Sequence, residues 1–264
     1  MPREIVDDRL LGALHVQALT RAGLDHDTLA EHRAVQSGTL EALMAGGYDG
    51  DATLAELLRL GDLGIGTVQA LDGELIVVDG HPYSAHADGS VTALSPLVRT
   101  PFAVVTKFVE TATATIDTPI DFDGLHDALD ELAPDASVLA VRVDGMFRDL
   151  VLRSVERQTK PYRPLHEVVE HQTEWRVDRA EGTVVGFRFP DATAGIEVPG
   201  HHLHFLATDR SLGGHVISIG LERGRLAVDP CEELHVELPP GVSLGTPGAV
   251  DRDRIETIEG GTHT

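Results

Sequence analysis

The chain has 264 residues, of which 42% are apolar, so it can bury a sizeable core and its composition does not predict disorder. Its length allows one large domain or two smaller domains that share an interface. The formal net charge of −22 argues against binding to nucleic acid, because an acidic surface repels phosphate groups. A small anionic substrate is still compatible with this charge, since a local cation or metal can outweigh the global field.

The chain contains one cysteine, Cys231, which excludes an internal disulfide and a cysteine-rich zinc site. The N-terminal sequence MPREIVDDRL lacks the basic start and apolar core of a secretory signal. No apolar run approaches the roughly 20 residues that a membrane helix needs. We therefore expect a cytoplasmic protein that makes no contact with a membrane.

The first elements are expected to be helical. Residues 1–35 are rich in charge and histidine and carry leucines at helical spacing, which predicts a peripheral arm or helix outside the core. Thr53 and Glu56 form a capping-box pattern, which predicts a short helix that ends at Gly61.

Strands are expected next, because Asp-Gly and Gly-His pairs separate short apolar runs. These runs are Gly66–Leu71, Glu74–Asp79, Pro82–Ala87 and Phe102–Val109. The first three predict a β-meander. Phe122–Leu132 is typical of an amphipathic helix, and Pro134 would stop it.

The remainder of the chain is expected to be rich in strands. Ser137–Val143 and Met146–Val155 predict a hairpin around Asp144-Gly145, and Pro164–His171 predicts a short helix. Further strands are expected at Gly182–Phe189, His201–Ala207, Gly213–Glu222 and Arg225–Asp229, and a last helical turn is expected within Val250–Glu259.

These elements predict an α/β (α+β) fold of two domains, each built on a mixed β-sheet with a few flanking helices. We expect an N-terminal arm or helix at residues 1–35 and a first mixed-sheet domain at residues 36–160. A second mixed-sheet domain at residues 161–264 is expected to carry a metal site.

The metal site is predicted from the histidine pattern in GHHLHFL at Gly200–Leu206. Residues two apart on a strand share a face and lie about 6.5–7 Å apart, so His202 and His204 face one side and His201 the other. A turn would then bring His215 back beside them. Three histidines with an open coordination position are typical of catalytic zinc, although imidazole also binds iron and manganese. With fourteen histidines in the chain, a solvent-facing pair that binds no metal is the alternative.

Two charged residues also stand out. Arg153 lies in the mostly apolar run Val151–Val155, where it can extend to the surface or bind an anion from the sheet. Glu74 follows Asp72-Gly73 at the expected start of a strand. From the residues alone, exposed hairpin charge is the preferred interpretation of both.

Ordered motifs from about Leu40 to the C-terminus resemble the α-acetolactate decarboxylase family. They are GDLGIGTVQALDGELIVVDG, VRVDG, RSVERQTKPY, GTVVGF, PGHHLHFL, GGHV and IETIEG. The first thirty-five residues have no recognised counterpart. The resemblance implies that His202, His204 and His215 bind Zn²⁺. His201 departs from the aromatic residue that members commonly carry at this position.

The resemblance also implies the catalytic residues. Glu74 and Arg153 match the active-site glutamate and arginine of the family, and Arg153 would bind substrate as well. Thr67 matches a threonine of the substrate-binding pocket. A C-terminal glutamate would reach the metal site, for which Glu259 is preferred over Glu256.

The function that the resemblance implies is zinc-dependent decarboxylation of (S)-2-acetolactate to (R)-acetoin and CO₂, in the acetoin and butanediol pathway. The metal would serve as the electron sink for an enediolate, and no organic cofactor would be used. Arg153 would hold a substrate oxygen and a glutamate, preferably Glu74, would deliver the proton. A homodimer is expected. The alternatives are another zinc enzyme, such as a hydrolase that activates water, a non-catalytic binding module and a structural β protein.

Overall fold

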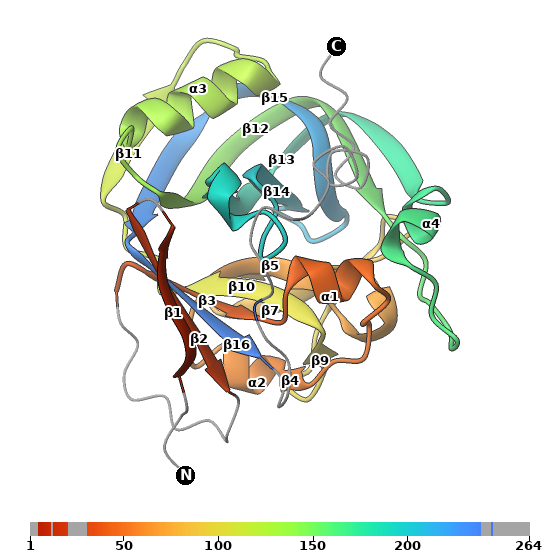
Figure 1. The fold of residues 1–264 in the computed structure, drawn as a ribbon. Helices are drawn as coiled ribbons and strands as arrows, with labels where there is room; N and C mark the ends of the chain where they lie inside the picture. Colours follow the sequence, from red (N-terminus) through yellow and green to blue (C-terminus); the bar gives the residue numbers. More distant parts are fainter. Residues whose placement is uncertain (1–4, 12, 21–30, 239–243, 245–264) are drawn as a thin grey trace.

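The computed structural model describes residues 5–11, 13–20, 31–238 and 244, and strands dominate it. Figure 1 shows the five-stranded sheet, yellow-green to blue, lying against the nine-stranded sheet, which is red to yellow apart from the blue strand β16 (Glu233–Leu238). The expected α/β (α+β) class with few helices is confirmed. Within the described residues, no helix is both long and apolar enough to cross a membrane.

The nine-stranded sheet has the order β1-β2-β16-β3-β10-β5-β6-β7-β8. Its strands are β1 (Ile5–Leu11), β2 (Leu14–Thr20), β3 (Arg33–Ser37), β5 (Leu63–Thr67), β6 (Glu74–Val78), β7 (His81–Ala85), β8 (Val91–Ala93), β10 (Phe102–Thr106) and β16 (Glu233–Leu238). Strand β16 runs parallel to β2 and β3, whereas the other pairs are antiparallel. This sheet is therefore mixed, as expected.

The five-stranded sheet has the order β11-β15-β12-β13-β14, and β14 pairs back onto β15. Its strands are β11 (Ala112–Ile116), β12 (Val138–Ser154), β13 (Thr173–Phe189), β14 (Gly200–Ala207) and β15 (Gly213–Cys231). All its pairings are antiparallel, so the expectation of a mixed sheet is wrong here. The β14–β15 pairing closes four of the strands into a barrel-like ring.

Short elements complete the fold. They are α1 (Leu40–Met44), α2 (Leu54–Leu57), α3 (Phe122–Leu132), α4 (Leu165–Val169), the 3₁₀ turns η1 (Gln69–Leu71) and η2 (Asp191–Thr193), and the small sheet of β4 (Ala52–Thr53) and β9 (Arg99–Thr100). Helix α3 has the predicted bounds, and the Asp121 side chain caps it by accepting a hydrogen bond from the Gly124 amide at 3.0 Å. The capping box of Thr53 and Glu56 is confirmed, although helix α2 ends at Leu57 rather than at Gly61.

Two expectations about local structure are wrong. Ile5–Leu11 and Leu14–Thr20 form the strands β1 and β2 rather than a helix, and β2 buries Leu14, Val16 and Ala18 completely. There is also no hairpin at Asp144-Gly145, because β12 continues through it. A Cβ atom on Gly145 would lie only 2.4 Å from the carbonyl oxygen of Arg223, so this glycine allows a neighbouring strand to approach.

The two sheets do not divide the chain at residue 160. Strands β11 and β12 precede this position but belong to the five-stranded sheet, whereas β16 follows it and belongs to the nine-stranded sheet. The domain boundary expected between residues 160 and 161 stays a prediction. The core that lies between the sheets takes residues from both, such as Ile76 and Phe187.

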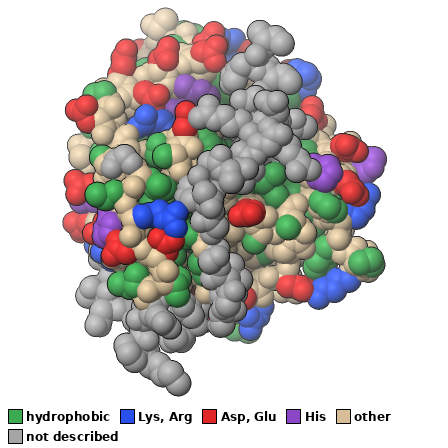
Figure 2. All heavy atoms as spheres, in the orientation of Figure 1, with side chains coloured by type: hydrophobic (Ala, Val, Ile, Leu, Met, Phe, Trp, Pro, Cys, Tyr) green, Lys and Arg blue, Asp and Glu red, His purple; other side chains and the backbone are tan. Residues whose placement is uncertain are grey.

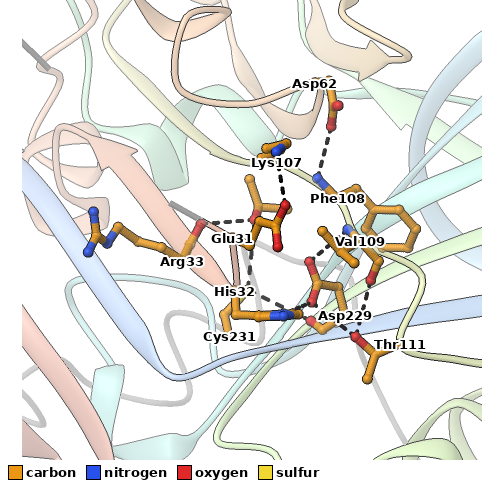
Figure 3. A network of polar contacts seen from close by, with 11 residues as sticks. Glu31, His32, Arg33, Asp62, Lys107, Phe108, Val109, Thr111, Asp229 and Cys231 are labelled. Carbon is orange, nitrogen blue, oxygen red and sulfur yellow. Dashed lines mark hydrogen bonds and ion pairs between the residues drawn. The ribbon is translucent and has the colours of Figure 1, made fainter. Parts of the chain in front are cut away.

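The Asp229 carboxylate lies close to the segments through which the described chain passes between the two sheets. The chain crosses from β10 to β11 through residues 107–111, and it returns from β15 to β16 at residue 232. The buried Asp229 carboxylate accepts a hydrogen bond from the Val109 amide at 3.0 Å and lies 2.6 Å from His32 Nδ1 (Figure 3). This carboxylate therefore links the end of β15 to the first crossing and to the segment before β3.

Candidate metal centre and active site

Three neighbouring strands of the five-stranded sheet bring the predicted site residues into one row. His204 of β14 pairs with His215 of β15, and His215 pairs in turn with Arg153 of β12. His202 lies two residues before His204, on the same face of β14. The turn after β14 therefore returns His215 beside the first two histidines, as predicted.

The three imidazoles form a compact cluster. One nitrogen from each of His202, His204 and His215 lies within 4.8 Å of the other two, and the ring centroids are 5.0–5.5 Å apart. A tetrahedral zinc ion with bonds of about 2.0–2.1 Å would hold its nitrogen ligands about 3.3 Å apart. Within the described residues, this is the one group of three potential ligands with such spacing.

The cluster lies away from solvent, where an imidazole loses its proton easily. The exposed fractions of His202, His204 and His215 are 8%, 0% and 3%. Burial, aided by the nearby Arg153 guanidinium, lowers the pKa of His202 to about 3. Burial also holds the pKa of His204 well below its ordinary value. Both rings are therefore neutral near pH 7, which is the form that binds a metal.

A hydrogen bond from the other sheet orients His204. Its Nδ1 lies 2.9 Å from the Leu75 carbonyl oxygen on β6, and because a carbonyl can only accept, Nδ1 carries the proton. The lone pair is then on Nε2, which is buried, makes no hydrogen bond within the described residues and lies 3.7 Å from Glu74 Oε2. Such an N–H to carbonyl bond is a common way to orient a metal-binding histidine. The residues present therefore fit a divalent ion.

Glu74 and Thr67 come from the nine-stranded sheet. They pair directly across β5 and β6, and both line a cavity that His202 and His215 also line. The Thr67 hydroxyl donates a hydrogen bond to the Gly73 carbonyl at 3.0 Å, which ties β5 to the turn that leads into Glu74. The site is thus assembled from both sheets, and the interpretation of Glu74 as exposed hairpin charge is wrong.

Arg153 is 5% exposed and points into the same cavity, so it is not a surface charge. The cavity has a volume of about 50 Å³. Its lining includes Arg153, Glu74, His202 and His215, and most of its other lining residues are apolar. A guanidinium buried beside a candidate metal centre is suited to bind an anionic substrate.

Other predicted and unpredicted residues complete the description of the site. Glu256 and Glu259 lie outside the described residues, so the role of a C-terminal glutamate stays a prediction. Sequence reasoning missed the Leu75 carbonyl and the apolar walls, which include Leu71. Backbone groups and turns in the left-handed region carry little sequence signal. Only the family motif GDLGIGTVQALDGELIVVDG, which contains Leu71 and Leu75, indicated this part of the chain.

His201 lies on the opposite face of β14 from the cluster, as predicted. Its Nε2 lies 3.0 Å from Asp130 Oδ1, and its ring stacks on that of His126 at 4.3 Å between centroids. The side chain therefore anchors helix α3 and takes no part in the cavity.

The fold and the cluster define a candidate metalloenzyme with a buried arginine beside the candidate metal centre. Residues 35–243 match the sequence model of the family described as alpha-acetolactate decarboxylase. A protein with this name from Methylococcus capsulatus is 43% identical over 210 residues, which cover 79% of this chain and 81% of that protein. Another from Bacillus subtilis is 35% identical over 250 residues, which cover 93% and 97%.

A solved structure agrees with these sequence matches. The crystal structure of alpha-acetolactate decarboxylase from Bacillus subtilis strain 168 superposes with a TM-score of 0.81 at 35% identity, covering 87% of this chain and 100% of that one. The chain therefore belongs to the α-acetolactate decarboxylase family, a family of carboxy-lyases.

Proposed function

We propose that this protein is a zinc-dependent decarboxylase that converts (S)-2-acetolactate to (R)-acetoin and CO₂. One observation carries the proposal: three buried imidazoles meet beside Glu74 and Arg153, which line a small cavity. Membership of the α-acetolactate decarboxylase family supplies the substrate.

His202, His204 and His215 would hold the zinc ion, and Glu74 Oε2 lies 3.7 Å from His204 Nε2, next to that centre. A site of three imidazoles with an open position favours zinc over the harder cations, which prefer oxygen ligands. When bound, zinc supplies a Lewis acid that stabilises the negative charge developing on the ketone oxygen as the carboxylate leaves.

The protein's own side chains position the substrate and move its proton. Arg153 binds the carboxylate or the hydroxyl of acetolactate through its planar fork. Its local positive charge favours an anionic substrate although the chain as a whole is acidic. Glu74 delivers a proton to one face of the carbon that has lost CO₂, and delivery from one side fixes the handedness of acetoin. The apolar walls exclude water, which strengthens both interactions.

The proposal is tested by following acetoin formation from acetolactate. We expect activity in the purified protein, loss of activity after chelation, recovery on addition of zinc, and no activity in His202→Ala. Full activity in metal-free protein would contradict the metal requirement. Cleavage of esters or lactones without acetoin formation would instead indicate a hydrolase that activates water at the same histidines.

We further propose that the enzyme is a homodimer. Strand β1 is the edge of the described nine-stranded sheet, and Ile5, Val6 and Leu10 on it are 52%, 45% and 70% exposed. An edge strand with exposed apolar residues tends to pair with another chain. Sedimentation analysis should show a dimer that Leu10→Lys weakens and the control Leu97→Lys, at an exposed turn residue, does not. A monomeric wild type would disprove the dimer.

The cytoplasmic location stays a prediction.

A further inference from the structure

The chain's single tryptophan, Trp175, lies behind the candidate metal centre. It belongs to β13 and pairs with Leu152 of β12, so the two side chains share a face of the five-stranded sheet. Arg153, the next residue, faces the cavity on the other side. The indole packs against the apolar cluster on the face away from the cavity. Trp175 therefore touches no atom of a substrate and can act on the site only through the sheet.

The indole ring lies close to two glycines from different sheets. A Cβ atom on Gly214, in β15, would lie only 2.9 Å from Cζ2 of Trp175. A Cβ atom on Gly89, in the turn between β7 and β8, would lie 3.6 Å from Cε2 of the same ring. Only a residue without a side chain allows the ring to approach β15 this closely. The indole thus joins the two sheets at the start of β15.

This packing carries a cost, because the Trp175 Nε1 atom is buried and has no hydrogen-bond partner in the described part of the chain. An indole N–H that is buried usually finds an acceptor, and leaving it without one is unfavourable. A phenylalanine would fill part of the same space without a buried donor. The contacts of the larger ring must therefore supply something that compensates for the unpaired N–H.

The backbone that the ring touches carries a candidate metal ligand. His215 directly follows Gly214, and its side chain faces the cavity. His215 pairs with His204 on one side and with Arg153 on the other. A large side chain removed from a packed site leaves a space that its neighbours fill only in part. Loss of the indole would therefore free the start of β15 to shift, and His215 would shift with it.

We propose that Trp175 is a positioning residue for the metal centre, which holds the backbone at Gly214 so that the His215 imidazole meets the other two. The inference rests on the proposed function, since it requires the zinc site. His204 is held in a comparable way by the Leu75 carbonyl of the nine-stranded sheet. Metal ligation depends on bond lengths and angles that tolerate little displacement, so supporting residues influence metal affinity.

The experiment measures zinc affinity by competition with a chromophoric chelator. Trp175→Ala should raise the Kd for zinc about ten- to one hundredfold, the usual effect of losing a residue that supports a metal ligand. Val177→Ala is the matched control, because Val177 lies two residues along β13 and packs against the same apolar cluster but pairs with Leu150. Its Kd should equal that of wild type.

Urea titrations of metal-free and zinc-loaded protein separate positioning from general support of the fold. Zinc raises the urea midpoint of the folded protein by an amount that depends on its Kd. In Trp175→Ala the difference between the two midpoints should shrink. An equal fall of both midpoints, with an unchanged Kd, would show that Trp175 serves the fold alone and would overturn the inference.

An exchange of size between the two touching residues tests the contact itself. Gly214→Ala should weaken zinc binding, because its methyl group meets the outer ring of Trp175. Phenylalanine lacks that outer ring, so Gly214→Ala combined with Trp175→Phe should bind zinc at least about twofold more tightly than Gly214→Ala alone. The other costs of alanine at Gly214 are common to both variants and cancel. Equal Kd values would overturn the inference, whereas a wild type that binds no zinc would overturn the proposed metal site instead.

Discussion

Replacing Arg153 by lysine should lower kcat/KM for acetolactate by about ten- to one hundredfold while leaving the metal bound. Arg153 is 5% exposed and lines the cavity with His202 and His215, so its contacts with substrate form away from water. A hydrogen bond to a charged group is worth about 1.5–3 kcal/mol, and each 1.4 kcal/mol corresponds to a factor of ten. Lysine keeps the charge but loses the planar fork that holds two oxygens at once.

The assay is acetoin formation at several acetolactate concentrations, with the metal content of each preparation measured in parallel. Arg142→Lys is the matched control, because Arg142 lies on the same strand but pairs with Asp79 and Asp144 and does not line the cavity. Wild-type kcat/KM in Arg153→Lys would refute the assignment of Arg153 to substrate binding. An equal loss in Arg142→Lys would show that the effect comes from β12 as a whole.

Two further predictions concern stability. Thr53→Ala removes the capping box of α2 and should cost about 1 kcal/mol in the free energy of unfolding, so an unchanged urea midpoint would contradict it. Burial raises the pKa of Asp229 above its ordinary value of 3.8, so the folded chain retains a proton that the unfolded chain releases. The stability from this group is present below about pH 4 and is lost as the pH rises through the folded-state pKa. Urea titrations at several pH values should show that Asp229→Asn removes this fall in the free energy of unfolding with rising pH. Profiles of unfolding free energy against pH that run parallel for wild type and variant would contradict the prediction.

Local patterns predicted those elements whose causes lie within a few residues. Helix α3 has its predicted bounds because an apolar stripe, a capping aspartate and a following proline act together over one short segment. The shared face of His202 and His204 follows from the alternation of side chains along a strand. In the N-terminal region, the alternation from Leu14 to Ala18 was a usable strand signal that the helical spacing of the leucines concealed.

Other features depend on contacts between distant segments, which a single sequence does not reveal. Gly145 looks like a turn residue, yet it lies within β12 because β15 approaches it closely. The contact of His204 with Leu75 and Glu74 joins residues about 130 positions apart. The family motifs singled out Glu74, which lines the cavity, whereas the exposed interpretation drawn from its residue type was wrong because it ignored the second sheet.

The central claim is that His202, His204 and His215 form one metal site, and zinc stoichiometry tests it most directly. After chelation, exposure to zinc and removal of the excess, elemental analysis should give one zinc per wild-type chain and close to none in His215→Ala. The control His201→Gln should retain one, because His201 faces Asp130 on the other side of β14. A full complement of zinc in His215→Ala, or none in wild type, would contradict the claim.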